Sequence, residues 1–126
     1  MPFAPFLHPD PDFSCTKTPN PEEKGAYELA LKLAEEKKAD IILVCDPDAD
    51  RMGVGVLHEG EYVLLSGNQS GSVLIEYILS QLQAKGQMPQ NPVMFNTIVT
   101  SDLGEKIASK YGVETEKTLT GFKFIG

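Results

Sequence analysis

Hydrophobic and polar positions change their spacing along the chain, and each spacing predicts a different element. From Ala26 to Ala34, apolar residues recur three and four positions apart, which indicates an amphipathic helix. The preceding Asn20-Pro21-Glu22-Glu23 offers an N-cap, a proline at the first helical position and a glutamate three residues after the cap. We therefore expect the helix to begin there. The continuous apolar run Ile41–Cys45, rich in β-branched residues, predicts a central strand buried on both faces.

The next segments predict a hairpin and a second helix. Met52–Leu57, where valines alternate with glycines, and Tyr62–Leu65 should be strands joined by a turn at His58–Glu61. A helix is expected from about Asn68 to Lys85, with Gly86 as its C-terminal stop. One face of this helix is apolar and consists of Leu74, Tyr77, Ile78 and Leu82.

Beyond Pro92 the pattern starts again as a βαβ unit. Val93–Thr100 and Val113–Lys117 should be strands, and Asp102–Tyr111 a helix ended by Gly112. A lone βαβ unit cannot cover both faces of its sheet, so we expect an incomplete second domain. That part should pack against the first domain, associate with another copy of the chain through strand edges, or be poorly ordered.

The predicted fold class is α/β, with a three-layer-type mixed sheet and flanking helices followed by the incomplete βαβ unit. The first domain would span residues 1–92, and the start of the next would span residues 93–126. Most of the nine prolines lie within residues 1–21, which indicates an extended lead-in without helix or strand interiors.

Composition narrows the function classes. The 41% hydrophobic and 23% charged residues are typical of a soluble globular protein. A net charge of -7 argues against binding to nucleic acid or to a membrane surface, and favours a cation as counter-charge. The apolar runs are far shorter than the roughly 20 residues that span a bilayer, and no secretory signal is apparent at the start, so we expect a cytoplasmic protein. Cys45 is expected to be a buried free thiol.

The chemistry of the chain concentrates in three aspartates after the apolar run. Asp46, Asp48 and Asp50 are spaced by two, so in an extended segment their carboxylates would project to one side. Like charges this close repel, and a divalent cation would stabilise the ionised form of each. A hard cation with oxygen ligands fits, and Mg²⁺ is usual where a phosphate completes the coordination. The carboxyl end of a strand is also where ligands bind in open α/β sheets.

The aspartates and Arg51 also have other interpretations. A calcium EF-hand loop fails twice, because Arg51 stands where glycine is required and Leu57 where a bidentate glutamate belongs. A solvated acidic turn without a ligand stays open. Arg51 is either a plain salt-bridge partner of the aspartates or a fork that holds a phosphate oxygen beside the metal.

Four motifs in order resemble those of the α-D-phosphohexomutase superfamily. The run Asp46–Arg51 resembles its metal loop, and Pro19–Glu23 resembles the segment before the helix of the same domain. Thr97–Ser101 and Thr118–Lys123 resemble the opening of the family's third domain, as in phosphoglucomutases and phosphopentomutases. The resemblance spans nearly the whole chain but a minor part of the family's length.

The resemblance implies an isomerase of carbohydrate metabolism, most closely a phosphoglucomutase. Such an enzyme converts glucose 1-phosphate to glucose 6-phosphate through a phosphoserine and a sugar bisphosphate. It implies Mg²⁺ on Asp46, Asp48 and Asp50, with the phosphoserine as a fourth ligand. A catalytic phosphate contact would fall to Arg51, and substrate binding to Arg51, Gly121 and Lys123. Lys123 can also be read as an ordinary exposed lysine between two phenylalanines.

The implied partners are a hexose or pentose phosphate and the remaining domains of the parent enzyme. The family's Ser-His-Asn run, its sugar-recognition loop and its fourth domain do not occur in these 126 residues. Without the phosphoserine domain, the chain alone is expected to be inactive. Neither His8 nor His58 has a partner at catalytic spacing. The sequence does not select among glucose, mannose and pentose. The alternative function is a stand-alone module that binds a divalent cation or phosphate without catalysis.

Overall fold

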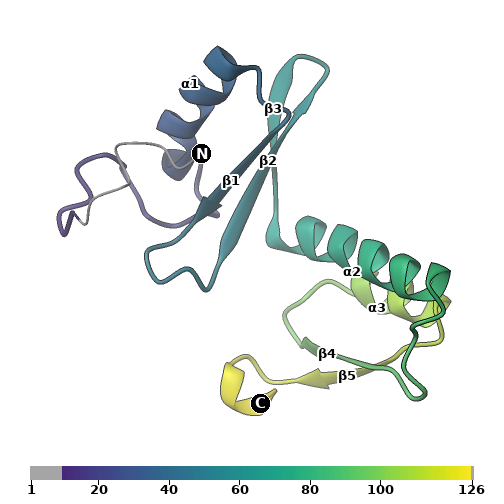
Figure 1. Cartoon of the computed structure of the whole chain (residues 1–126). Coiled ribbons are helices and arrows are strands. Elements are labelled where there is room, and N and C mark those ends of the chain that lie inside the picture. Colours follow the sequence, from purple (N-terminus) through teal and green to yellow (C-terminus); the bar gives the residue numbers. More distant parts are fainter. Residues whose placement is uncertain (1–9, 126) are drawn as a thin grey trace. The chain divides into compact units, whose positions relative to one another are not determined.

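The computed structural model describes residues 10–125, and the chain divides into two compact units, Met1–Gly67 and Asn68–Gly126 (Figure 1). The division falls at the start of the second long helix, whereas the sequence pattern predicts a first domain that includes this helix and spans residues 1–92. Residues 1–9 of the proline-rich lead-in lie outside the described part. Residues 10–23 form turns and bends, in agreement with their proline content.

Within residues 10–67, the first unit combines a 3₁₀ helix and an α-helix with a three-stranded antiparallel sheet. Its elements are η2 (Lys24–Tyr27), α1 (Glu28–Lys37), β1 (Ile41–Cys45), β2 (Met52–His58) and β3 (Glu61–Leu65), and the strand order is β1-β2-β3. Glu59 and Gly60 both have positive φ, 50° and 88°, as the tight turn between β2 and β3 requires. The predicted hairpin is therefore confirmed.

The first helix begins later than predicted. The Asn20 side-chain oxygen accepts a hydrogen bond from the Glu22 amide at 3.1 Å, and the Asn20 amide group donates to the Glu23 carboxylate at 3.3 Å. Asn20 thus caps a turn of its own, because its side chain competes with the helix for the same backbone groups. A 3₁₀ turn follows, and α-helical geometry starts only at Glu28.

The core of the first unit lies between α1 and the sheet. Tyr27, Ala34 and Ile42 are buried there, and Leu64 of β3 packs against them. β1 is an edge strand, and Ile41 and Leu43, on its other face, are 53% and 59% exposed. The prediction of a central strand buried on both faces is wrong for the described residues. Cys45 is a free thiol, as predicted, but it is exposed.

The second unit contains the predicted βαβ arrangement. Its elements are α2 (Gly67–Ala84), β4 (Val93–Thr97), α3 (Leu103–Lys110), β5 (Glu114–Thr118) and η3 (Phe122–Phe124), and β4 pairs with β5 in parallel. The α/β fold class is confirmed. As predicted, Gly86 ends α2: its φ is 63°, and the Gln87 amide donates to the Leu82 carbonyl at 2.9 Å. None of the helices in residues 10–125 has the length and hydropathy needed to cross a bilayer.

Side-chain contacts explain why α2 groups with the second unit. The Tyr111 hydroxyl donates to the Glu76 carboxylate at 2.6 Å, and the Asn68 side-chain oxygen accepts from the Ser101 amide at 3.0 Å. The predicted apolar stripe of α2 remains largely on the surface, since Leu74, Tyr77 and Ile78 are exposed.

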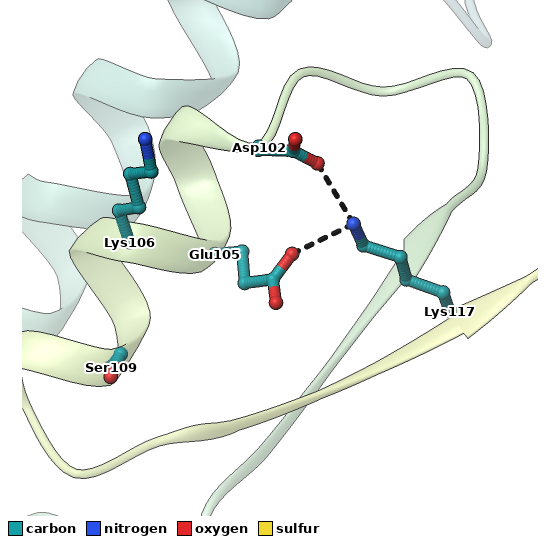
Figure 2. A pocket seen from close by; sticks show the side chains of 5 residues that line it. All are labelled: Asp102, Glu105, Lys106, Ser109 and Lys117. Atoms are coloured by element: carbon teal, nitrogen blue, oxygen red, sulfur yellow. Dashed lines mark hydrogen bonds and ion pairs between the residues drawn. The ribbon is translucent and has the colours of Figure 1, made fainter.

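An ion-pair cluster ties α3 to β5. The Lys117 ammonium lies 2.8 Å from the carboxylates of both Asp102 and Glu105, at the start of α3 (Figure 2). The hydrogen bond from Lys117 lowers the pKa of Asp102, and the two carboxylates raise the pKa of Lys117. The cluster links the first turn of α3 to β5 through one lysine that both carboxylates share.

Candidate metal centre

The aspartate loop joins β1 to β2 in the first unit. Cys45 and Met52 form the last pair between β1 and β2, so residues 46–51 make up the connection. The Ala49 amide donates to the Asp46 carbonyl at 3.1 Å, and the Asp46 amide donates to the Arg51 carbonyl at 3.4 Å. Ala49 has a φ of 58°, in the left-handed region, which turns the chain sharply. The loop is a compact turn rather than the extended segment that the spacing suggested.

The turn brings three carboxylates together. One oxygen from each of Asp46, Asp48 and Asp50 lies within 4.8 Å of the others. The Asp46 side chain is 1% exposed, whereas Asp48 and Asp50 are open to solvent. The predicted convergence is therefore present, with one buried and two accessible carboxylates.

Arg51 closes the loop by holding Asp46. Its backbone amide donates to Asp46 Oδ1 at 3.0 Å, and its Nε donates to Asp46 Oδ2 at 2.7 Å. The same Nε lies 3.6 Å from Asp50 Oδ1. The salt-bridge interpretation of Arg51 is thus realised in this structure. Its side chain remains 54% exposed, so the guanidinium is accessible from solvent.

These contacts set the protonation of the cluster. Burial by itself would raise the pKa of Asp46, but the hydrogen bonds from the Arg51 amide and guanidinium outweigh it and lower the pKa to about 2. The pKa of Asp50 is raised, first by its hydrogen bond with Asp46 and then by the charge of Asp48. Asp46 is thus strongly held as an anion, and repulsion persists at Asp50, which a bound cation would relieve.

The donor set fits a small hard cation. Mg²⁺ takes oxygen ligands at about 2.0–2.1 Å in an octahedron, so oxygens bound to one ion lie roughly 3–4 Å apart. The separation of up to 4.8 Å between the carboxylate oxygens is slightly wider than that. Because Asp48 and Asp50 are exposed, modest side-chain rotation can close the difference. Three carboxylates also leave room for water or phosphate oxygens in the remaining positions.

The other predicted site residues lie in the second unit. Gly121 has a φ of 128°, and Lys123 follows in η3 with its ammonium 4.9 Å from the centre of the Phe124 ring. Lys123 is exposed. The four loop residues therefore belong to the first unit and the two turn residues to the second.

Two residues close to the loop, Tyr27 and Gly53, are not marked as site residues by any motif in the sequence. Tyr27 packs against Gly53, at the start of β2, and donates a hydrogen bond to the Pro21 carbonyl at 2.9 Å. The available signal was Gly53 itself, because a glycine inside a strand often marks close approach of another part of the chain.

Comparison with known proteins assigns both units. Residues 5–60 match the family model described as phosphoglucomutase/phosphomannomutase, alpha/beta/alpha domain II. Residues 66–126 match the model for alpha/beta/alpha domain III of the same family. These two models place a domain junction between residues 60 and 66, in line with the division of the structure.

Individual relatives are mutases of sugar phosphates by name. The chain is 44% identical over 119 residues to a probable phosphomannomutase of Haemophilus influenzae, covering 94% of this chain and 24% of that protein. It is 36% identical over 117 residues to a phosphomannomutase of Mycoplasmoides pirum, covering 93% of this chain and 21% of the relative. It is 38% identical over 118 residues to a phosphoglucomutase of Staphylococcus aureus, again covering 93% and 21%.

A solved structure shares the fold. The chain resembles the apo-form crystal structure of N-acetylglucosamine-phosphate mutase, a member of the α-D-phosphohexomutase superfamily, with a TM-score of 0.52 and 16% identity. The likeness covers 68% of this chain and 19% of that one. The chain thus spans about a quarter or less of the length of these relatives. Two successive domain models and the relatives agree, and the chain belongs to the phosphoglucomutase/phosphomannomutase family.

Proposed function

We propose that this chain supplies the metal-binding loop of a Mg²⁺-dependent sugar-phosphate mutase, most closely a phosphoglucomutase. The observation that carries the proposal is the convergence of three carboxylates beside Arg51 in a unit that matches the family's domain II. The reaction would move phosphate between two positions of one sugar, through a phosphoserine and a sugar bisphosphate. Its expected setting is the cytoplasm, together with the remaining domains of a parent enzyme.

Each loop residue has a role in this proposal. Asp46, Asp48 and Asp50 would hold Mg²⁺, which when bound offsets negative charge on a phosphate. Arg51 uses Nε to hold Asp46, and its guanidinium has four further N–H donors that can take phosphate oxygens. It would therefore orient both a metal ligand and the phosphate. Gly121 and Lys123 would contact the sugar phosphate from the next domain.

A second candidate function is a module that binds a divalent cation or phosphate without catalysis. It is favoured by one observation, which is that all four loop residues belong to a single compact unit. Metal binding alone does not separate the two functions, whereas turnover does.

Mg²⁺ should bind the isolated chain weakly, through the loop. Three carboxylates supply part of an octahedral shell, and without the phosphoserine ligand the site is incomplete. In calorimetric titration, Asp48→Asn combined with Asp50→Asn should abolish the heat of binding. Asp40→Asn removes an exposed carboxylate just before β1 and serves as the matched control. An unchanged response in the double variant would contradict the assignment of the metal to this loop.

The purified chain should not interconvert glucose 1-phosphate and glucose 6-phosphate, because no nucleophilic serine is identified in it. A chimera should be active, in which these residues replace the 119-residue matched segment of the Haemophilus influenzae relative. The assay would use glucose and mannose phosphates, and a chimera with all three loop aspartates changed to asparagine is the control. A folded chimera without turnover would favour the binding module.

A further inference from the structure

Tyr27 is the most deeply buried large side chain in the described residues, with 1% exposure. Its hydroxyl donates to the Pro21 carbonyl at 2.9 Å. The Tyr27 hydroxyl and the Pro21 carbonyl oxygen both lie directly against the backbone of Gly53. A methyl group built on Gly53 would overlap the hydroxyl oxygen and lie 2.5 Å from the Pro21 carbonyl oxygen. Two parts of the chain before the sheet are thus fixed against β2 at a single point.

That point lies one strand pair away from the pair that borders the metal loop. Gly53 pairs with Val44, and the next pair, Cys45 with Met52, is the last before the loop. Asp46 and Arg51 follow at once on either side, joined by hydrogen bonds from the Arg51 amide and Nε to the Asp46 carboxylate. Any movement of β2 against β1 at Gly53 would therefore change the separation of Asp46 and Arg51.

We propose that Tyr27 is a positioning residue for the metal loop, acting through Gly53 to fix the end of the β1–β2 ladder. Its hydroxyl fills the space above the Gly53 backbone and satisfies the buried Pro21 carbonyl. Without the hydroxyl, that carbonyl loses its donor and the strand gains room to shift. The effect on metal binding rests on the proposed function, whereas the effect on loop geometry does not.

The chain offers a matched pair of variants for the test. Tyr27→Phe and Tyr62→Phe each remove one hydroxyl that donates to a backbone carbonyl within the first unit. Tyr62 donates to Ala39 at 2.6 Å, just before β1, and so at the end of that strand opposite the loop. Both variants should still fold, because each removes a single oxygen atom. Urea titrations would measure their free energies of unfolding. Comparison of the two separates an effect on the loop from a general loss of stability.

The first readout is the NMR amide shift of Arg51 and of Asp46 in the metal-free chain. Tyr27→Phe should move the Arg51 amide, which bonds to the Asp46 carboxylate, while Tyr62→Phe should leave it in place. The second readout is Mg²⁺ affinity by calorimetry. It should fall about tenfold in Tyr27→Phe alone, as for other residues that orient metal ligands. Equal changes in the two variants, or none at Arg51, would overturn the proposal.

Failure of the proposed metal site would look different. If the wild-type chain bound no Mg²⁺, the proposed metal function would be wrong. The NMR shift of the Arg51 amide would still test whether Tyr27 positions the loop. If Tyr27→Phe proved unfolded, native-state hydrogen exchange of the wild-type chain would decide it. The amides of Arg51 and Tyr27 should then open with the same free energy, as one cooperative unit. Opening of Arg51 at a much lower free energy than Tyr27 would contradict the proposal.

Discussion

Gly53→Ala should lower the free energy of unfolding of the first unit by about 3 kcal/mol, the upper range for overpacking a core. The added methyl would overlap the Tyr27 hydroxyl, lie 3.0 Å from Tyr27 Cζ and lie 2.5 Å from the Pro21 carbonyl oxygen. Neither neighbour can withdraw easily, because Tyr27 is 1% exposed and Pro21 is buried backbone. Urea denaturation followed by circular dichroism measures the change.

Gly55→Ala is the matched control for that measurement. It makes the same substitution two residues further along β2, where the closest atom is the Cδ2 of Leu64 at 3.1 Å. A leucine methyl can rotate aside, so the cost should stay below about 1 kcal/mol. Equal costs at the two glycines would mean that the close packing of Tyr27 on Gly53 does not exist in solution.

Arg51→Ala in the chimeric mutase should lower kcat by about a hundredfold or more, as for other preorganised donors that act on transition-state charge. The change should reach kcat and kcat/KM alike, because the contact strengthens as phosphate is transferred. Turnover should fall more than thermal stability, because the Arg51 side chain is half-exposed and an alanine keeps the backbone amide that bonds to the Asp46 carboxylate.

Arg51→Lys separates charge from geometry in the same assay. Lysine keeps the positive charge but cannot offer the planar fork that binds Asp46 and phosphate together. We expect it to recover part of the activity at most. If Arg51→Ala instead reduced stability and left kcat intact, Arg51 would be only a salt-bridge partner of Asp46.

The sequence predicted the elements whose signals are local. The hairpin from Met52 to Leu65 and the βαβ unit after Val93 follow from alternation, turn residues and helix spacing within a few positions. The start of the first helix was misplaced by another local effect. Asn20 can cap either a helix or a separate turn, and the amino-acid sequence alone does not distinguish the two.

Features that depend on distant partners were harder to predict. The apolar run of β1 shows that both faces tolerate burial, but only the strand order shows that it lies at an edge. The grouping of α2 likewise depends on contacts to Ser101 and Tyr111, which the helix pattern does not contain.

The candidate site shows the same division. The spacing predicted that the three aspartates form one cluster. The burial of Asp46 and its hydrogen bond from the Arg51 amide depend on the fold. The contribution of Tyr27 could not be predicted from the sequence, because Tyr27 contacts a residue that has no side chain and that lies 26 positions further along the chain, Gly53. In the sequence, the only sign of such a close approach is the glycine itself.

Because Ala49 has a left-handed backbone conformation, we expect the turn to form before any ion binds to the loop. An alanine in that conformation costs roughly 1–2 kcal/mol, so the rest of the chain must impose it. The Asp46 carbonyl and the Arg51 contacts do so within the protein itself. An ion that reaches the loop would bind to a preformed turn, so none of its binding free energy would be used to order the backbone. In this respect the loop is unlike small zinc domains, whose fold is assembled by the metal.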